Sequence, residues 1–145
     1  MTEVIAPLNL SDEQALVRQT VREFARGELQ PLAAGIDANE KIPAEIWKRL
    51  SDLQLMGVPI PEQYGGMGLN SLCGCTVVEE LAAVCASTAL ALSAHVGLGT
   101  APIAKFGTEE QKKRFLPDLA GGKKIIAFGL TEPGAGSDAG GTQTV

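Results

Sequence analysis

The sequence predicts a mainly α-helical domain followed by the first strand or strands of a β-rich unit. Up to about residue 120, apolar residues recur at the spacing of helices, and capping residues stand at the expected helix starts. After Gly121-Gly122 the pattern changes, because glycine becomes frequent and the run Ile125–Leu130 is short, apolar and partly β-branched. Residues 142–145 have the character of a second strand. The change of period places the boundary between the two parts at about residue 121.

Composition limits the classes of function. The chain has 145 residues, the length of one domain, with 12 Lys and Arg against 17 Asp and Glu. A net charge of −5 argues against general nucleic-acid binding, which needs clustered basic residues. No apolar run is long enough to span a bilayer, residues 1–6 do not resemble a signal peptide, and the three cysteines lack the spacing of a zinc site. We therefore expect a cytoplasmic protein without a membrane span, a targeting segment or a bound metal.

The first helix is expected to begin after Ser11, because Ser11 and Gln14 fit a capping box. Pro31 should end or kink this helix, and residues 32–37 would continue it. The apolar stripe of the helix consists of Val17, Val21, Phe24 and Ala25. Another face carries a row of arginines, for which we expect solvent exposure and local pairs with Glu: Arg18, Arg22 and Arg26.

Four further helices follow from the same rules. They are predicted over residues 43–57, 71–86 and 88–98, and over a short stretch that begins after Thr108 and closes at Pro117. Thr108 and Gln111 fit a second capping box at the start of that stretch. The helix over 88–98 is apolar nearly all round, so we expect it to be central and buried. Two prolines and three glycines make residues 58–68 a shaped loop instead of a regular element.

Polar and reactive side chains of the helical part are expected to be structural. Glu79 and Glu80 should form an outward-facing pair on a helix surface. His95, the only histidine, should be a packed core or pocket-lining residue on an apolar helix. Five more side chains are expected to serve packing, with the cysteines as buried small hydrophobes: Cys73, Cys75, Cys85, Trp47 and Tyr64.

The segment Leu130–Asp138 differs from the rest of the chain in composition and place, since it follows the predicted strand. Its glycines permit close backbone approach, and Thr131 and Ser137 add hydroxyl groups. Such a loop can present N–H groups and hydroxyls to a flat heteroaromatic ring or a phosphate. The same composition also suits an ordinary surface turn. The segment is neither a Walker A loop nor a GxGxxG fingerprint.

This segment resembles the flavin-binding signature of the acyl-CoA dehydrogenase family: an aromatic residue, two further residues, then Thr-Glu-Pro-x-Ala-Gly-Ser-Asp. Phe128 stands where the family usually has Tyr, which keeps the ring and removes a hydroxyl. Other stretches resemble the family in the same order along the chain: residues 10–37, the Pro-Glu-x-Tyr-Gly-Gly core within 57–68, Val78–Leu81 and Phe106–Lys112. The similarity is greatest to short-chain, butyryl-CoA-type members.

The resemblance implies an N-terminal helical domain, a middle β-domain and a C-terminal four-helix bundle. Residues 1–121 would form the first of these, and 122–145 would begin the second, so we expect a partial chain. The family's catalytic base is a Glu of the C-terminal bundle, a region that these 145 residues do not contain, so no catalytic residue is assigned. Glu132 and the pair Glu79 and Glu80 are not expected to replace that base.

The resemblance also implies the cofactor FAD and the residues that hold it. Main-chain groups of Leu130 and Thr131 and the Thr131 hydroxyl would bond the isoalloxazine ring, and Ser137 would contact both flavin and acyl-CoA. The helix from Leu92 to Leu98 would line the acyl-chain pocket. The full implied set of cofactor-binding residues is Phe128, Gly129, Leu130, Thr131, Gly134, Gly136 and Ser137.

The implied reaction is α,β-dehydrogenation of an acyl-CoA thioester, in which a carboxylate takes the α-proton and flavin N5 takes the β-hydride. The implied partners are the acyl-CoA substrate, an electron-transfer flavoprotein and further copies of the chain in a homotetramer. An acyl-CoA oxidase or a flavin monooxygenase of the same fold is an alternative. So is a helical interaction module without catalysis, because the chain has no base and only part of a flavin site.

Overall fold

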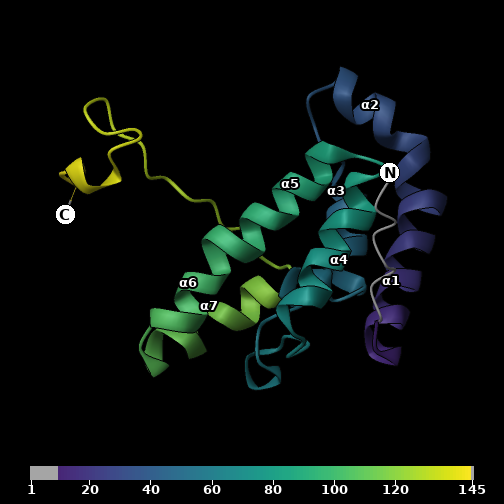
Figure 1. The fold of residues 1–145 in the computed structure, drawn as a ribbon, viewed down its shortest axis with the longest axis horizontal. Coiled ribbons are helices and arrows are strands. Elements are labelled where there is room, and N and C mark those ends of the chain that lie inside the picture. The colour runs from purple at the N-terminus through teal and green to yellow at the C-terminus, as the bar shows by residue number, and fades with distance from the viewer. Residues whose placement is uncertain (1–9, 145) are drawn as a thin grey trace, which may run out of the picture.

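The computed structural model describes residues 10–144 as a bundle of helices from which residues 123–144, here called the arm, extend to one side (Figure 1). Residues 1–6, which are not expected to be a signal peptide, lie outside the described residues. The α-helices are α1 (Asp12–Phe24), α2 (Ala33–Ala38), α3 (Ala44–Asp52), α4 (Ser71–Ala82), α5 (Ala86–Ser93), α6 (Ala101–Phe106) and α7 (Glu109–Ala120). The prediction of a mainly helical structure is confirmed.

Both predicted capping boxes are present. The backbone N–H of Gln14 donates to Ser11 Oγ at 3.3 Å, and the N–H of Ser11 donates to Gln14 Oε1 at 3.0 Å. Thr108 and Gln111 make the same reciprocal bonds at the start of α7. Because these bonds satisfy N–H groups that have no partner inside the helix, they fix the first residue of each helix.

The first helix continues past its proline, as expected. A π-helical segment (Ala25–Leu29) and a 3-10 turn (Gln30–Leu32) carry the chain from α1 into α2 without a break. Pro31 lies in the first turn of the 3-10 segment, where its missing N–H is tolerated. The second predicted helix is shorter than expected: α3 ends at Asp52, and the residues up to Gly57 form a turn at Gln54 and a 3-10 segment instead.

The core lies where α4 packs between α1 and α5 (Figure 1). Successive turns of α4 each contribute a buried apolar side chain, at Cys73, Val77 and Leu81, and residues of α3 and of the segments on both sides of it complete the core. The largest fully buried apolar residues of this core are Leu29, Ile46, Leu50, Met56, Leu81 and Leu92. Burial of each such side chain contributes about 1.5–3 kcal/mol to folding, which is why these positions decide the arrangement of the helices.

The helix predicted over 88–98 is longer and less buried than expected. It runs from Ala86 to Phe106 as α5, a π-helical segment (Ala94–Thr100) and α6. Glycines 97 and 99 and Pro102 indicate an end by local rules, but the wide π-helical turn accommodates the glycines, and Pro102 lies in the first turn of α6, where its missing N–H is tolerated. The prediction of burial all round is wrong, since Leu90 is 71% exposed and Leu98 52% exposed.

Pro117 does not close the last helix, contrary to prediction. It lies inside α7, which continues to Ala120, and its own carbonyl still accepts from the N–H of Gly121. The continuation brings Leu119 and Ala120 into buried positions beside Leu116. Burial of these side chains offsets the single helical hydrogen bond that proline cannot donate.

The arginine row and the glutamate pair meet each other, which corrects two predictions. Glu80 of α4 is buried instead of outward-facing, and its carboxylate accepts from Arg22 Nε at 2.8 Å and Arg22 Nη2 at 2.6 Å. Arg18 donates to Glu79, 61 positions away in the sequence, at 3.0 Å. The arginines therefore join α1 to α4 instead of pairing locally. The hydrogen bonds from Arg22 hold the pKa of Glu80 below its usual value.

The predicted strand over 125–130 is absent, and none of the residues 142–144 is in a strand; Val145 lies outside the described residues. The arm has no regular pairing in the described chain except one isolated bridge between Glu132 and Ala135. A strand needs a neighbouring strand to pair its N–H and C=O groups, and residues 10–144 supply none beside this segment. Within the same residues, no helix is both long and apolar enough to cross a membrane.

Replacing Glu80 with Gln should lower the free energy of unfolding by about 1–3 kcal/mol, because Arg22 loses its charged, doubly bonded partner. Glu79→Gln is the matched control, since Glu79 is exposed, and it should change stability by less than about 1 kcal/mol. Urea denaturation of the three proteins measures both values. The effect of Glu80→Gln should be complete above pH 4.5, the ordinary pKa of Glu, and should shrink as the pH falls below it, because a carboxyl group with a lowered folded pKa loses its stabilisation as the pH falls through that pKa. Equal destabilisation by both variants would contradict this account.

Candidate functional site

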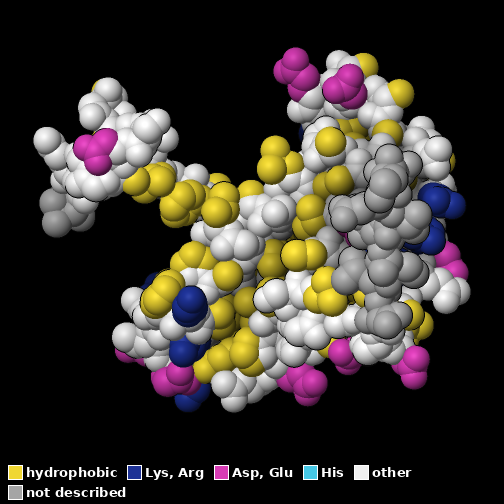
Figure 2. Space-filling model, in the orientation of Figure 1, with side chains coloured by type: hydrophobic (Ala, Val, Ile, Leu, Met, Phe, Trp, Pro, Cys, Tyr) yellow, Lys and Arg dark blue, Asp and Glu magenta, His cyan; other side chains and the backbone are white. Residues whose placement is uncertain are grey.

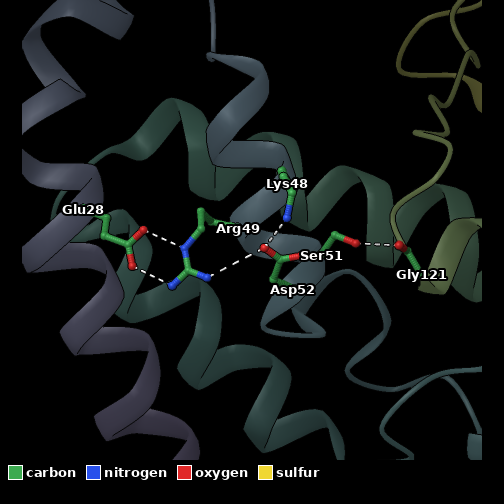
Figure 3. Close-up of polar contacts among 6 residues, drawn as sticks. All are labelled: Glu28, Lys48, Arg49, Ser51, Asp52 and Gly121. Carbon is green, nitrogen blue, oxygen red and sulfur yellow. Dashed lines mark hydrogen bonds and ion pairs between the residues drawn. The ribbon is translucent and has the colours of Figure 1, made fainter.

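The candidate site lies on the arm. Contacts made by α3 help to fix the turn from which the arm leaves the helices. Arg49 of α3 donates through Nε and Nη2 to the two carboxylate oxygens of Glu28, each at 2.7 Å, and Lys48 pairs with Asp52 at 2.7 Å (Figure 3). These pairs are exposed and contribute little stability individually. The two parallel bonds between Arg49 and Glu28 join α3 to the π-helical segment that continues α1, and Ser51 of α3 faces Gly121, two residues before the arm (Figure 3).

The arm leaves the helices at a glycine turn that packs against α3. The Ser51 hydroxyl donates to the carbonyl of Gly121 at 2.5 Å (Figure 3). Gly122 has φ +68°, and a Cβ on it would lie 2.6 Å from Ser51 Cβ. Both the backbone conformation and the lack of space therefore require glycine at position 122.

Asp118 of α7 holds the next residues of the chain. Its carbonyl accepts from the backbone N–H groups of Lys123 and Lys124 at 2.9 and 3.1 Å. Its carboxylate pairs with Lys124 Nζ at 2.8 Å, and this bond keeps the pKa of Asp118 below its usual value. The arm is thus tied to α7 as well as to α3.

His95 makes the last contact between the arm and the helices. Its Nδ1 lies 3.2 Å from the backbone nitrogen of Ile126, and its Nε2 lies 3.2 Å from the carbonyl oxygen of Leu119. The ring is fully buried, as the sequence predicts for a core or pocket histidine. Beyond Ile126 the arm runs clear of the helices (Figure 1).

The end of the arm is a small closed loop. Glu132 and Ala135 exchange two backbone hydrogen bonds of 3.0 and 3.1 Å. The Glu132 carboxylate accepts from the backbone N–H groups of Gln143 and Thr144, each at 2.9 Å. These bonds close the chain over 132–144 and lower the pKa of Glu132. A carboxylate held in this way is a structural acceptor, consistent with its exclusion as a base.

The predicted cofactor residues are all exposed on the arm. Phe128, Gly129, Leu130 and Thr131 are all exposed, and Phe128 retains 52% of its accessible area. Nothing lies within 4 Å of a Cβ placed on Gly134 or Gly136, and Ser137 is exposed as well. The structure brings these residues together by chain proximity, and no helix of the described part covers them (Figure 1).

This surface has the donors that a flavin would need. No hydrogen bond within residues 10–144 occupies the backbone groups of residues 127–131 or the Thr131 hydroxyl. Free N–H and C=O groups beside apolar side chains suit a flat ring that combines polar edges with an apolar face. The residues present therefore fit one wall of an FAD site.

A second feature of the site is an apolar cavity of about 580 Å³ between α4, the helix that follows it and residues 55–59. Leu92, Ser93, Val96 and Gly97 line it, so part of the stretch expected to line an acyl pocket does border a cavity. The sequence reasoning missed the opposite wall. That wall comes from α4 and the turn before it: Leu55, Val58, Pro59, Ser71, Gly74, Cys75, Val77, Val78 and Glu79.

Cys75 corrects one prediction, because it is exposed and borders the cavity, whereas Cys73 and Cys85 are buried as expected. The signal was available: Gly74, whose missing side chain leaves open space beside Cys75, interrupts the apolar pattern of α4. Burial raises the pKa of the Cys73 thiol, which is therefore a packing residue. Tyr64 is a buried anchor as predicted, and its hydroxyl donates to Glu109 at 2.7 Å.

Several carboxylates of the described chain are engaged in other contacts, and Glu79, which borders the cavity, accepts from Arg18 at 3.0 Å. Glu132 is bound to amides, Glu80 to Arg22, and Glu109 to Tyr64 and Lys112. These hydrogen bonds lower the pKa of each of the three carboxyl groups, which opposes service as a base near neutral pH. Residues 10–144 also contain no group of three His, Cys, Asp or Glu side chains that could hold a metal ion.

Replacing Glu132 with Ala should open the loop end of the arm while the helices keep their stability. The amides of Gln143 and Thr144 lose their acceptor, so their hydrogen exchange should accelerate about tenfold or more, as expected for a bond to a charged group. Glu132→Gln keeps one acceptor oxygen and should have an intermediate effect. Exchange rates measured residue by residue test this, and unchanged rates in the Ala variant would show that the carboxylate does not close the loop.

The chain resembles known proteins over the helices and the arm alike. Residues 11–123 match the model of the family "Acyl-CoA dehydrogenase, N-terminal domain". A short-chain specific acyl-CoA dehydrogenase of Clostridium acetobutylicum is 50% identical over 137 residues, 94% of this chain and 36% of that protein. The chain thus spans about a third of the length of the curated relatives it matches.

Solved structures show the same likeness. Butyryl-CoA dehydrogenase of Megasphaera elsdenii matches with a TM-score of 0.87 and 41% identity over 94% of this chain and 36% of that one. Acyl-CoA dehydrogenase of Bacillus anthracis, complexed with FAD, gives 0.87 and 37% over 95% and 24%. A chain from the work on the electron transferring flavoprotein of Acidaminococcus fermentans gives 0.89 and 40% over 94% and 36%. This chain belongs to the acyl-CoA dehydrogenase family, of which it contains the N-terminal domain.

Proposed function

We propose that this chain is the N-terminal part of an FAD-dependent acyl-CoA dehydrogenase that acts on short-chain acyl-CoA thioesters. One observation carries the proposal: the Thr131–Asp138 loop, which resembles the family's flavin signature, is open on an arm that the helices tie at three successive points. The similar enzyme of Clostridium acetobutylicum is short-chain specific, and the similar structure from Bacillus anthracis holds FAD.

The arm would supply one wall of the FAD site. The free backbone groups of Leu130 and Thr131 and the Thr131 hydroxyl would bond the edge of the isoalloxazine ring, with Phe128, Gly129, Gly134, Gly136 and Ser137 beside it. Ser137 would also contact the acyl-CoA. When bound, FAD supplies the hydride acceptor of the reaction. The role of these residues is to bind and orient the ring, because none of them carries a group that could remove the α-proton.

The acyl chain would lie against the helix from Leu92 to Leu98, in the apolar cavity that this helix forms with α4. Almost all of the cavity wall is apolar, and each buried methylene of the substrate would contribute about 0.8 kcal/mol to binding. The open space at Gly74 and Gly97 keeps the cavity wide, since neither glycine has an atom within 4 Å of its Cβ position.

The remaining parts of the enzyme would come from further sequence and further copies. We place a domain boundary at residues 121–122, with a β-domain beginning at residue 122 and the catalytic Glu in a later helical bundle. A homotetramer in the cytoplasm with an electron-transfer flavoprotein as electron acceptor is the matching assembly. The likeness to a chain from the Acidaminococcus fermentans work on such a flavoprotein supports this partner.

The decisive experiment compares the complete protein encoded by the gene with these 145 residues alone. The complete protein should bind FAD stoichiometrically and oxidise butyryl-CoA with an artificial electron acceptor, whereas the 145 residues alone should do neither. Oxygen consumption without an added acceptor would identify an oxidase or a monooxygenase. A complete protein without flavin and without turnover would favour a helical interaction module instead.

Thr131→Val in the complete protein should weaken FAD binding or slow flavin reduction by about tenfold, because the substitution is nearly isosteric and removes one buried hydrogen bond worth roughly 1–3 kcal/mol. Thr142→Val is the matched control on the same arm, since the Thr142 hydroxyl bonds only to the Ala139 carbonyl in the described chain. Flavin fluorescence titration and stopped-flow reduction measure the two quantities. If neither quantity changes, Thr131 is not part of the flavin site.

Gly97→Leu should fill the cavity and raise the KM for butyryl-CoA while FAD binding stays as in the unchanged protein. Gly27→Leu is the control, because Gly27 also lies in a π-helical segment with open space around its Cβ position but does not line the cavity. Steady-state kinetics over acyl chains of four to eight carbons should show the largest loss for the longest chain. Identical kinetics for the two variants would move the acyl chain to another surface.

A further inference from the structure

We propose that His95 is a positioning residue for the flavin-binding loop: its neutral ring joins the helix wall of the acyl cavity to the arm at Ile126, and so sets where Phe128–Thr131 lie. The inference rests on the proposed function, because it assigns a role to His95 in that same site. It extends the site to a buried side chain that touches neither of the proposed ligands.

The partners of the ring assign a single tautomer. The backbone N–H of Ile126 can only donate, so Nδ1, 3.2 Å away, must accept and carry no proton. The carbonyl of Leu119 can only accept, so Nε2, also at 3.2 Å, must carry the hydrogen. A protonated ring would turn two donors toward each other at Ile126. Burial lowers the pKa of His95, in agreement with a neutral ring.

Gly99 also determines how closely Ile126 approaches the helix. Gly99 lies one turn after His95, and a Cβ placed on it would lie 2.3 Å from Ile126 Cγ2 and 3.2 Å from Ile126 Cβ. A side chain at position 99 would therefore overlap the branched side chain of Ile126 as far in as its Cβ, so Ile126 would have to move away from the helix. Hydrogen bonding from His95 and the missing side chain of Gly99 together bring Ile126 against the helix.

The contact between His95 and Ile126 lies between the two surfaces of the proposed site, and the positioning role follows from that location. Ile126 is the last arm residue that the helices hold, and the proposed flavin residues begin immediately beyond Ala127. The other face of the same helix turn, Val96 and Gly97, lines the apolar cavity. His95 thus fixes the distance between the surface proposed for the acyl chain and the backbone proposed for the ring. A misplaced reacting pair slows the reaction even when both ligands bind.

Two substitutions separate the two bonds. Asn at position 95 places an acceptor oxygen near the position of Nδ1 but does not reach Leu119, whereas Gln reaches the position of Nε2 but leaves Ile126 without its acceptor. In the complete protein, His95→Gln should accelerate hydrogen exchange in the peptide over 125–130 and weaken FAD binding or slow flavin reduction by about tenfold. His95→Asn should restore both to within about threefold. Gly99→Ala should repeat the effect of His95→Gln.

Thr88→Val is the matched control, since Thr88 is equally buried in the same helix but its hydroxyl bonds to Cys85 Sγ. It should change neither the exchange of residues 125–130 nor the flavin readouts. Equal flavin readouts for His95→Gln, His95→Asn and Thr88→Val would overturn the positioning role. So would faster exchange in His95→Gln with both FAD binding and flavin reduction unchanged. An unchanged protein that binds no FAD would instead overturn the proposed function, and amide exchange would still measure the bond to Ile126.

Discussion

The packing of the helix from Ala86 to Phe106 determines how the other parts of this molecule are arranged, because different faces of this helix contact different neighbours. One face packs on α4 and completes the core through Ala89 and Leu92. The next face borders the apolar cavity, and His95 and Gly99 receive the arm and the end of α7. The helix keeps Leu90 and Leu98 exposed, and Figure 2 shows apolar surface on the bundle and near the base of the arm. A single element therefore relates the core, the cavity and the loop to one another.

Much of the helical part could be predicted from local sequence because its signals are local. Hydrogen bonds between neighbouring residues determine the capping boxes at Ser11 and Thr108, and the structure has both. Prediction from local sequence failed where contacts between residues far apart in the sequence determine the structure. Local rules end a helix at Pro117, yet burial of Leu119 and Ala120 extends it. Local sequence predicts that Glu80 is a surface residue, but in the structure Arg22, 58 positions earlier, lies against it.

The candidate site likewise has parts that local sequence predicts and parts that depend on contacts between distant residues. The loop around Thr131 could be identified because its composition is unusual and its residues are contiguous. The cavity wall on α4 could not, because Gly74 and Cys75 meet Val96 and Gly97 only after α4 and the next helix pack. The strand predicted over 125–130 has the right residues but no partner within 10–144, and β-structure depends on the partner more than on the residues. The sequence predicts His95 as a packed residue, while its bond to Ile126 depends on a fold that brings together residues 31 positions apart.

The ion pairs between α1 and α4 also bear on the order in which the chain folds. The α4–α5 hairpin closes through a turn of three residues, 83–85, so its contacts cost little loop entropy and can form early. Arg22 and Glu80 are 58 residues apart, and docking of α1 must enclose α3 and the loop between them. We expect α1 to join a preformed α4–α5 hairpin late. Substitutions at its arginines would then mainly accelerate unfolding and leave the folding rate nearly unchanged.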